Sequence, residues 1–102
     1  MFLIQILLPL CDNSGASFSH LQYEQVRDEL TELFGGVTAY LRSPAQGLWK
    51  ESGALAVQDD IVIYEVMTEN LDQEWWHKYR EKLTADFRQD LLIVRVNEVQ
   101  LL

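Results

Sequence analysis

The chain has 102 residues, of which 48% are hydrophobic and 24% are charged, so it suits one small globular domain rather than a disordered segment. Its formal net charge is −8 at pH 7, and its eight lysines and arginines are scattered without a basic run. An acidic surface repels phosphate backbones and anionic lipids, which argues against binding to nucleic acids or membrane surfaces.

The N-terminal stretch FLIQILLP (2–9) is a short apolar run that ends in a proline. This is typical of a central strand that is covered on both faces. The stretch resembles a signal peptide only superficially, because it lacks a positive start, is interrupted by Gln5 and precedes no small-residue cleavage site. We therefore expect a buried strand and a cytoplasmic protein.

A helix is predicted to begin after Ser19, because Ser19 and Gln22 have the spacing of a capping box. It is predicted to end at Gly35 and Gly36, since glycine accepts the left-handed conformation found at helix C-termini. At the helical period its apolar face comprises Tyr23, Val26, Leu30, Leu33 and Phe34.

The next stretch, VTAYLRS (37–43), alternates in polarity and favours a second strand. Residues 44–59 contain Pro44, Gly47 and Gly53 and are predicted to form a loop. Trp49 lies within this loop, where an indole would serve as a lid over a pocket or as a plug in an interface. A third strand is predicted over DIVIYEVMT (60–68), which is apolar on both faces.

The second helix is predicted over 71–88, with Asn70 and Gln73 as a capping box. A fourth strand is expected over DLLIVRV (90–96), followed by an apolar tail over 97–102. The helix carries its apolar residues within one arc, namely Trp75, Trp76, Tyr79, Leu83 and Phe87.

The order β-α-β-β-α-β predicts a single ferredoxin-like α+β domain over residues 1–102. Right-handed crossovers place the first and third strands in the middle of a four-stranded antiparallel sheet, with both helices on one face. Strand alternation then assigns to the helix side Phe2, Ile4, Ile6, Leu8, Val37, Ala39, Leu41, Val62, Tyr64, Val66, Leu92, Val94 and Val96. The opposite face receives Leu3, Gln5, Leu7, Thr38, Tyr40, Arg42, Ile61, Ile63, Glu65, Met67, Leu91, Ile93 and Arg95.

This second face is too apolar to be left in water, and such a patch normally marks an interaction surface. A twofold copy of the chain is the simplest cover, so we expect a homodimer with its sheets packed face to face. The tail over 97–102 is long enough to add to that contact.

The same face carries a polar or charged side chain from every strand. One interpretation is an arginine–glutamate network that fixes the register of the dimer. The other is a polar floor for a small organic ligand, with the surplus of arginine over glutamate slightly favouring an anion. With the loop tryptophan included, the candidate ligand-binding residues are Tyr40, Arg42, Trp49, Glu65 and Arg95.

Catalytic residues are not evident in the sequence. His20 and His77 are predicted on helix surfaces without a partner aimed at them. The single cysteine and the two histidines do not have the spacing of metal ligands, so we expect no metal and no other cofactor.

The stretches FGGVTAYLRSPAQGLW, IVIYEVM, WWHKYREKL and FRQDLLIVR resemble a family of small uncharacterised bacterial proteins. That resemblance covers most of the chain after residue 30 and implies a stand-alone ferredoxin-like domain. At the level of fold, the chain is also similar to the dimeric α/β-barrel superfamily, which includes cofactor-free monooxygenases, lactone isomerases and stress-response proteins. No catalytic motif of that superfamily is carried over to this sequence.

Three hypotheses of function follow from these features. The first is a homodimer that binds a small organic molecule or acts as an interaction module. The alternative is a cofactor-independent enzyme of the dimeric-barrel type, a small monooxygenase or isomerase, with Tyr40 or a histidine as the proton-transfer group. The third is a regulatory protein that uses its acidic first helix.

Overall fold

The computed structural model describes the backbone of residues 1–50 and 56–102, and the side chains of residues 1–40 and 61–102. Its elements follow in the order β1 (Phe2–Pro9), α1 (His20–Phe34), β2 (Thr38–Lys50), β3 (Ala56–Thr68), α2 (Gln73–Asp86) and β4 (Ile93–Glu98). The predicted ferredoxin-like α+β order is confirmed. Within the described residues, no helix has the length and apolar character needed to span a membrane.

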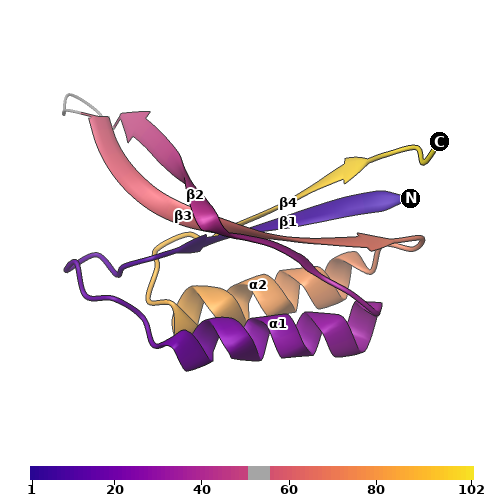
Figure 1. Cartoon of the computed structure of the whole chain (residues 1–102), viewed down its shortest axis with the longest axis horizontal. Helices are drawn as coiled ribbons and strands as arrows, with labels where there is room; N and C mark the ends of the chain where they lie inside the picture. Colours follow the sequence, from indigo (N-terminus) through magenta and orange to yellow (C-terminus); the bar gives the residue numbers. More distant parts are fainter. Residues whose placement is uncertain (51–55) are drawn as a thin grey trace.

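The four strands form one antiparallel sheet in the order β2-β3-β1-β4. The first and third strands are central, as the crossover rule predicts. Figure 1 shows both helices on one side of this sheet. We call the opposite side the open face; its described side chains include Leu3, Gln5, Leu7, Tyr40, Ile63, Glu65, Met67, Ile93 and Arg95.

The hydrophobic core lies between the sheet and the two helices. It is filled from alternate positions of the central strands, each at most 2% exposed, namely Ile4, Ile6, Leu8, Val62, Tyr64 and Val66. From the helices it receives mainly Val26, Leu30, Trp76, Tyr79 and Leu83. The expectation that Leu33 belongs to the buried face of its helix is wrong, because Leu33 is 57% exposed. Val96 lies on the covered side as predicted, opposite Ile4, but it is 44% exposed because β4 is an edge strand.

The helix ends follow local hydrogen bonding. The Ser19–Gln22 capping box is confirmed, because Leu21 N donates to Ser19 Oγ and Gln22 Oε1 accepts from Ser19 N. The second predicted box is wrong: α2 is capped by Asp72, whose Oδ1 accepts from Trp75 N at 3.1 Å. Asn70 belongs to the turn after β3, where its carbonyl accepts from the Thr68 hydroxyl.

The predicted loop over 44–59 is wrong on both of its sides, because β2 extends to Lys50 and β3 begins at Ala56. The pairing of β2 with β3 shifts register between Tyr40 and Ala45. Pro44 lies in that irregularity, where its missing N–H interrupts no regular ladder. Pro44 therefore marks a bulge here, and Gly47 lies in the interior of a strand; neither residue marks a turn.

The last strand is Ile93–Glu98 rather than 90–96. After α2 the chain makes a turn in which Gln89 N donates to Thr84 O and Arg88 has a φ of 49°. Arg88 was predicted at the end of the helix, which instead ends at Asp86, and the strand begins three residues later than predicted. The start of the predicted tail belongs to β4, and Val99 N continues the pairing by donating to Met1 O at 2.8 Å.

Candidate functional site

The open face contains a line of polar side chains that crosses all four strands. Gln5 on β1 is paired with Glu65 on β3 and with Arg95 on β4, while Thr38 on β2 is paired with Glu65. Tyr40 lies two residues beyond Thr38, at the diagonal distance that a long aromatic side chain spans. We call Tyr40, Glu65, Gln5 and Arg95 the polar row.

Hydrogen bonds join the members of the polar row. Tyr40 OH donates to Glu65 Oε2 at 3.3 Å, and Gln5 Nε2 donates to the other carboxylate oxygen, Oε1. Arg95 Nε donates to Gln5 Oε1 at 2.7 Å. Each oxygen of Glu65 thus has a neutral donor, which holds the carboxylate in one orientation while leaving lone pairs on both oxygens for a further partner.

The polar row brings together three of the five binding residues named from the sequence, Tyr40, Glu65 and Arg95. The connection between arginine and glutamate runs through Gln5, which the sequence placed on this face but not among the binding residues. Arg42 and Trp49 lie in β2, and their side chains are outside the described residues. The roles assigned to these two side chains stay predictions.

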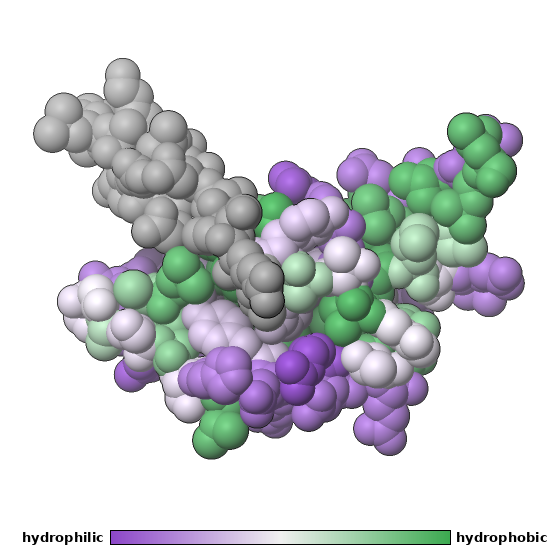
Figure 2. Space-filling model, in the orientation of Figure 1, coloured by the Kyte–Doolittle hydropathy of each residue, from purple (hydrophilic) through white to green (hydrophobic). Residues whose placement is uncertain are grey.

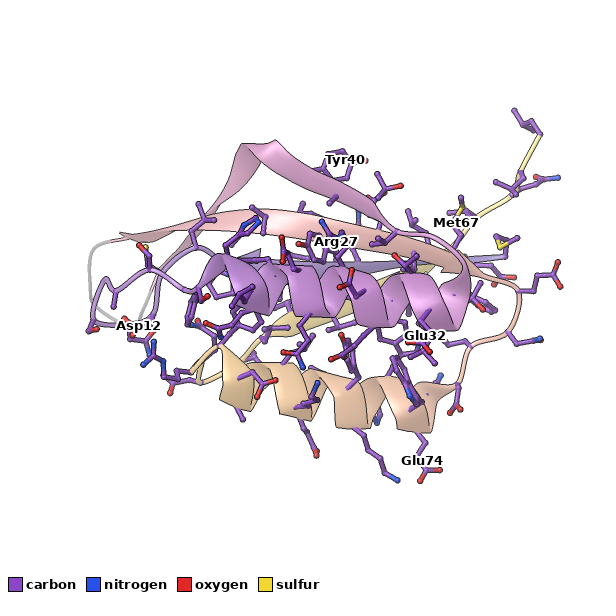
Figure 3. The ribbon with its side chains drawn as sticks, turned by 60° about the horizontal axis from the view of Figure 1, so that its bottom comes forward. Asp12, Arg27, Glu32, Tyr40, Met67 and Glu74 are labelled. Atoms are coloured by element: carbon purple, nitrogen blue, oxygen red, sulfur yellow. The ribbon has the colours of Figure 1, made fainter. Side chains whose placement is uncertain are left out.

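The open face is amphipathic around the row. Tyr40 is 47% exposed, and the apolar side chains Met67, Leu91 and Ile93 are 51%, 68% and 49% exposed. Figure 3 shows Tyr40 and Met67 on the side of the sheet away from the helices, whereas Glu74 lies on the outer side of α2. In Figure 2, hydrophobic residues gather where the C-terminus emerges, at the upper right.

A pocket adjoins the polar row where α1 ends and β2 begins. It has a volume of about 430 Å³, within the range of small-molecule sites. Its described lining comprises Leu3, Phe34, Gly35, Gly36, Val37, Thr38, Glu65, Val66 and Met67. We call this pocket the notch. Glu65 is the charged side chain among these residues, so a ligand in the notch meets one carboxylate and described walls that are otherwise uncharged.

Phe34 forms the aromatic wall of the notch and is held by the tryptophans of α2. Its ring stacks on Trp76 with centroids 5.3 Å apart and meets Trp75 edge-on at 5.5 Å. The sequence assigned these aromatic residues to the core, which is correct for Trp76. The notch itself was missed, because it depends on where α1 ends relative to β3.

A second hollow, of about 300 Å³, lies between α1 and α2. Its rim is closed by charges that satisfy one another, since Lys82 Nζ lies 3.0 Å from Glu29 Oε1 and 4.0 Å from Asp86 Oδ2. Its floor is formed by core residues such as Val26 and Leu83. The notch is the better candidate because its carboxylate faces neutral groups.

Proton-transfer groups divide between the two sides of the sheet. Tyr23 OH donates to Pro9 O at 2.6 Å, and Tyr64 OH donates to Tyr23 O at 3.2 Å. Burial raises the pKa of Tyr23 to about 12 and also raises the pKa of Tyr64. These phenols hold the core together, whereas Tyr40 is exposed beside a carboxylate. His20 pairs with Glu24 on the outer surface of α1 at 2.8 Å.

Comparisons with known proteins give a likeness of fold. No protein-family model and no curated protein sequence matches the chain. Two solved structures do: a phage SAM lyase in complex with S-methyl-5'-thioadenosine and a phage SAM lyase in the apo state. The TM-scores are 0.65 and 0.61, each at 17% sequence identity over 95% of this chain, and the match covers 80% and 79% of those chains.

At this identity the likeness shows a shared architecture and transfers no residue role. It agrees with the small α+β domain predicted from the sequence. Membership of the small bacterial family stays a prediction.

Proposed function

We propose that the chain binds a small organic cation on the open face, with its charge at Glu65 and its apolar part in the notch. One observation carries the proposal: a carboxylate oriented by donors on both oxygens lines a pocket of about 430 Å³ whose other described walls are uncharged. Both described donors to Glu65 are neutral side chains. A bound cation would add an opposite charge, and charge-assisted hydrogen bonds are stronger than neutral ones.

Among the described side chains, which do not include Arg42, the charge distribution favours a cation over the anion that the sequence suggested. That preference rested on two arginines against one carboxylate. Arg95 lies at the far end of the polar row, where it donates to Gln5, and Glu65 is the charged residue of the notch. The net charge of −8 attracts cations to the whole surface.

The fold neighbours suggest the first ligands to test. One of them is a SAM lyase in complex with S-methyl-5'-thioadenosine. S-adenosylmethionine carries a sulfonium cation that is joined through a ribose to a flat adenine ring, and an amino-acid chain on the same sulfur. S-methyl-5'-thioadenosine has the same nucleoside but lacks both the sulfonium charge and the amino-acid chain. Comparing the two compounds therefore tests whether binding requires more than the nucleoside.

Isothermal titration calorimetry with both compounds tests the proposal. We expect the Glu65→Gln variant to bind S-adenosylmethionine at least about tenfold more weakly, a loss of about 1.4 kcal/mol, and to bind S-methyl-5'-thioadenosine with a smaller change. Glu98→Gln is the matched control, because Glu98 is an exposed carboxylate of the same sheet, paired with Phe2 at the end of β4. Absence of binding to the wild-type chain at millimolar concentration, or equal losses in both variants, contradicts the proposal.

A second candidate is a cofactor-independent enzyme, favoured by the exposed Tyr40 phenol that hydrogen-bonds Glu65 at 3.3 Å. Such a pair suits proton transfer to or from a bound substrate. In an elimination from S-adenosylmethionine, this pair would take a proton from the carbon next to the C–S bond, the C–H electrons would form a C=C bond in the amino-acid product, and the C–S electrons would go to sulfur, which leaves as the neutral thioether S-methyl-5'-thioadenosine. Chromatographic detection of S-methyl-5'-thioadenosine from S-adenosylmethionine tests this activity. We expect Tyr40→Phe to reduce turnover and to retain binding. Binding without turnover in the wild-type chain would contradict the enzyme and support the first candidate, a binding protein.

A homodimer through the open face is also part of the proposal. Leu91, Ile93 and Met67 are about half exposed or more, and a second copy would cover them. Sedimentation velocity at micromolar concentration is expected to show a dimer that Ile93→Glu converts to a monomer. A wild-type particle of 11.9 kDa contradicts the dimer.

A further inference from the structure

Two successive glycines follow α1, and their backbones differ. Gly35 has a φ of 80°, in the left-handed region, and its N–H donates to Thr31 O at 2.8 Å. A side chain at this position would be strained, so the helix end itself explains Gly35. Gly36 does not share this conformation. Its φ lies outside the left-handed region that favours glycine.

Crowding within the chain does not explain Gly36 either. A Cβ placed on Gly36 meets no heavy atom of the described residues within 4 Å. Glycine at a position that allows alanine costs about 0.4–1 kcal/mol, because it enlarges the freedom of the unfolded chain. Gly36 is exposed, so a larger side chain at this position would extend into open space rather than into the core.

That space belongs to the notch. Gly36 lines it between Phe34, whose ring rests on Trp76, and Thr38, which is paired with Glu65. Leu3 and Met67 supply apolar walls from the neighbouring strands. The charged end of the notch and the glycine therefore lie in the same pocket, which gives the pocket one polar and one apolar part.

We propose that Gly36 is a specificity-determining residue, which keeps the notch open for a bulky apolar group of the ligand while Glu65 binds the ligand's positive charge. This inference rests on the proposed function and specifies its ligand class, an organic cation with a compact aromatic or branched apolar end. Larger side chains at position 36 then select for smaller ligands without disturbing the fold.

Two model cations test this without knowledge of the natural ligand. Benzyltrimethylammonium has a charge and an aromatic ring, whereas tetramethylammonium has the charge alone. Binding is followed by the backbone amide chemical shifts of ¹⁵N-labelled protein, including residues 35–38. We expect the wild-type chain to bind the benzyl compound more tightly and to shift these amides.

In the Gly36→Leu variant we expect the dissociation constant of benzyltrimethylammonium to rise at least about tenfold, while that of tetramethylammonium stays unchanged. Glu65→Gln is expected to weaken both compounds. Gly36→Ala is the graded control: it should retain the fold and give an intermediate loss. It also keeps the test decisive if the leucine variant does not fold.

The outcomes separate the two proposals. If both cations bind in a Glu65-dependent manner and Gly36 variants bind the benzyl compound normally, the role of Gly36 is wrong and the proposed function stands. If neither cation binds the wild-type chain, both are wrong. If Gly36→Leu alters the sedimentation coefficient while binding is unchanged, the notch receives a second copy of the chain, which overturns the inference.

Discussion

The two faces of the sheet differ in burial and in polarity. On the covered face, the alternate residues of β1 from Ile4 to Leu8 and of β3 from Val62 to Val66 are at most 2% exposed, and among the described residues no polar or charged side chain other than tyrosine is buried. On the open face, the residues between them are half-buried, and a hydrogen-bonded row of Tyr40, Glu65, Gln5 and Arg95 crosses the sheet. Stability depends on the first face, and the second is available for binding.

Adjacent leucines of β1 test this division most strongly. Leu8 is fully buried on the covered face, whereas Leu7 is half-buried on the open face. We expect Leu8→Ala to lower the free energy of unfolding by about 2–5 kcal/mol, and Leu7→Ala by about 1 kcal/mol or less in the monomer. Urea denaturation at two protein concentrations measures both. If Leu7→Ala lowers the free energy of unfolding strongly, and more so at the higher protein concentration, a second copy of the chain covers the open face. If both variants lose the same free energy of unfolding at both concentrations, the contrast between the two faces is contradicted.

The covered face also makes a pH prediction through Tyr23, whose pKa burial raises to about 12. Below pH 10 both the folded and unfolded chains keep this proton. Above pH 10 the unfolded chain loses it first, so the free energy of unfolding falls as the pH rises toward 12. Thermal denaturation between pH 8 and 11.5 measures the decline.

Tyr23→Phe is the control for this experiment. The variant loses the hydrogen bond to Pro9 O and should be about 1 kcal/mol less stable at pH 8. Its stability should then depend less steeply on pH than that of the wild-type chain. Parallel curves for the two proteins contradict the assignment.

The smallest effect is expected from the polar row itself. A double-mutant cycle with Gln5→Ala and Glu65→Ala should give a coupling of about 0.2–1 kcal/mol, the range for paired side chains across strands. Such a value means that the row contributes little to folding and is available to a ligand. A coupling of several kcal/mol would make the row a structural element and weaken the contrast between the faces.

The fold was predictable where a periodic pattern coincided with a local signal. Ser19 and Gln22 mark the start of α1, and the alternation over 2–9 and 60–68 assigns the two faces of the central strands correctly. Pro44 led to the wrong prediction of a loop, because a register shift accommodates the proline within β2. Only strand pairing, which the sequence does not display, distinguishes such a bulge from a turn.

The site was predictable only in part. Strand alternation placed Tyr40, Glu65 and Arg95 on one face, but their order along a rung depends on register. Gln5 was therefore not identified as the link between Glu65 and Arg95. The notch depends on how α1 leads into β2, which the sequence does not show. The one feature of the sequence that points to it is Gly36, because the helix end requires only Gly35.

Mapping S-adenosylmethionine onto the backbone amides by nuclear magnetic resonance tests the central claim most directly, because it reports on both faces at once. We predict that the largest chemical-shift changes occur at residues 35–40 and 63–67, with smaller changes along α1 and α2, and that Glu65→Gln reduces them. Largest changes in the groove between the helices, or no changes at millimolar ligand, would contradict the account.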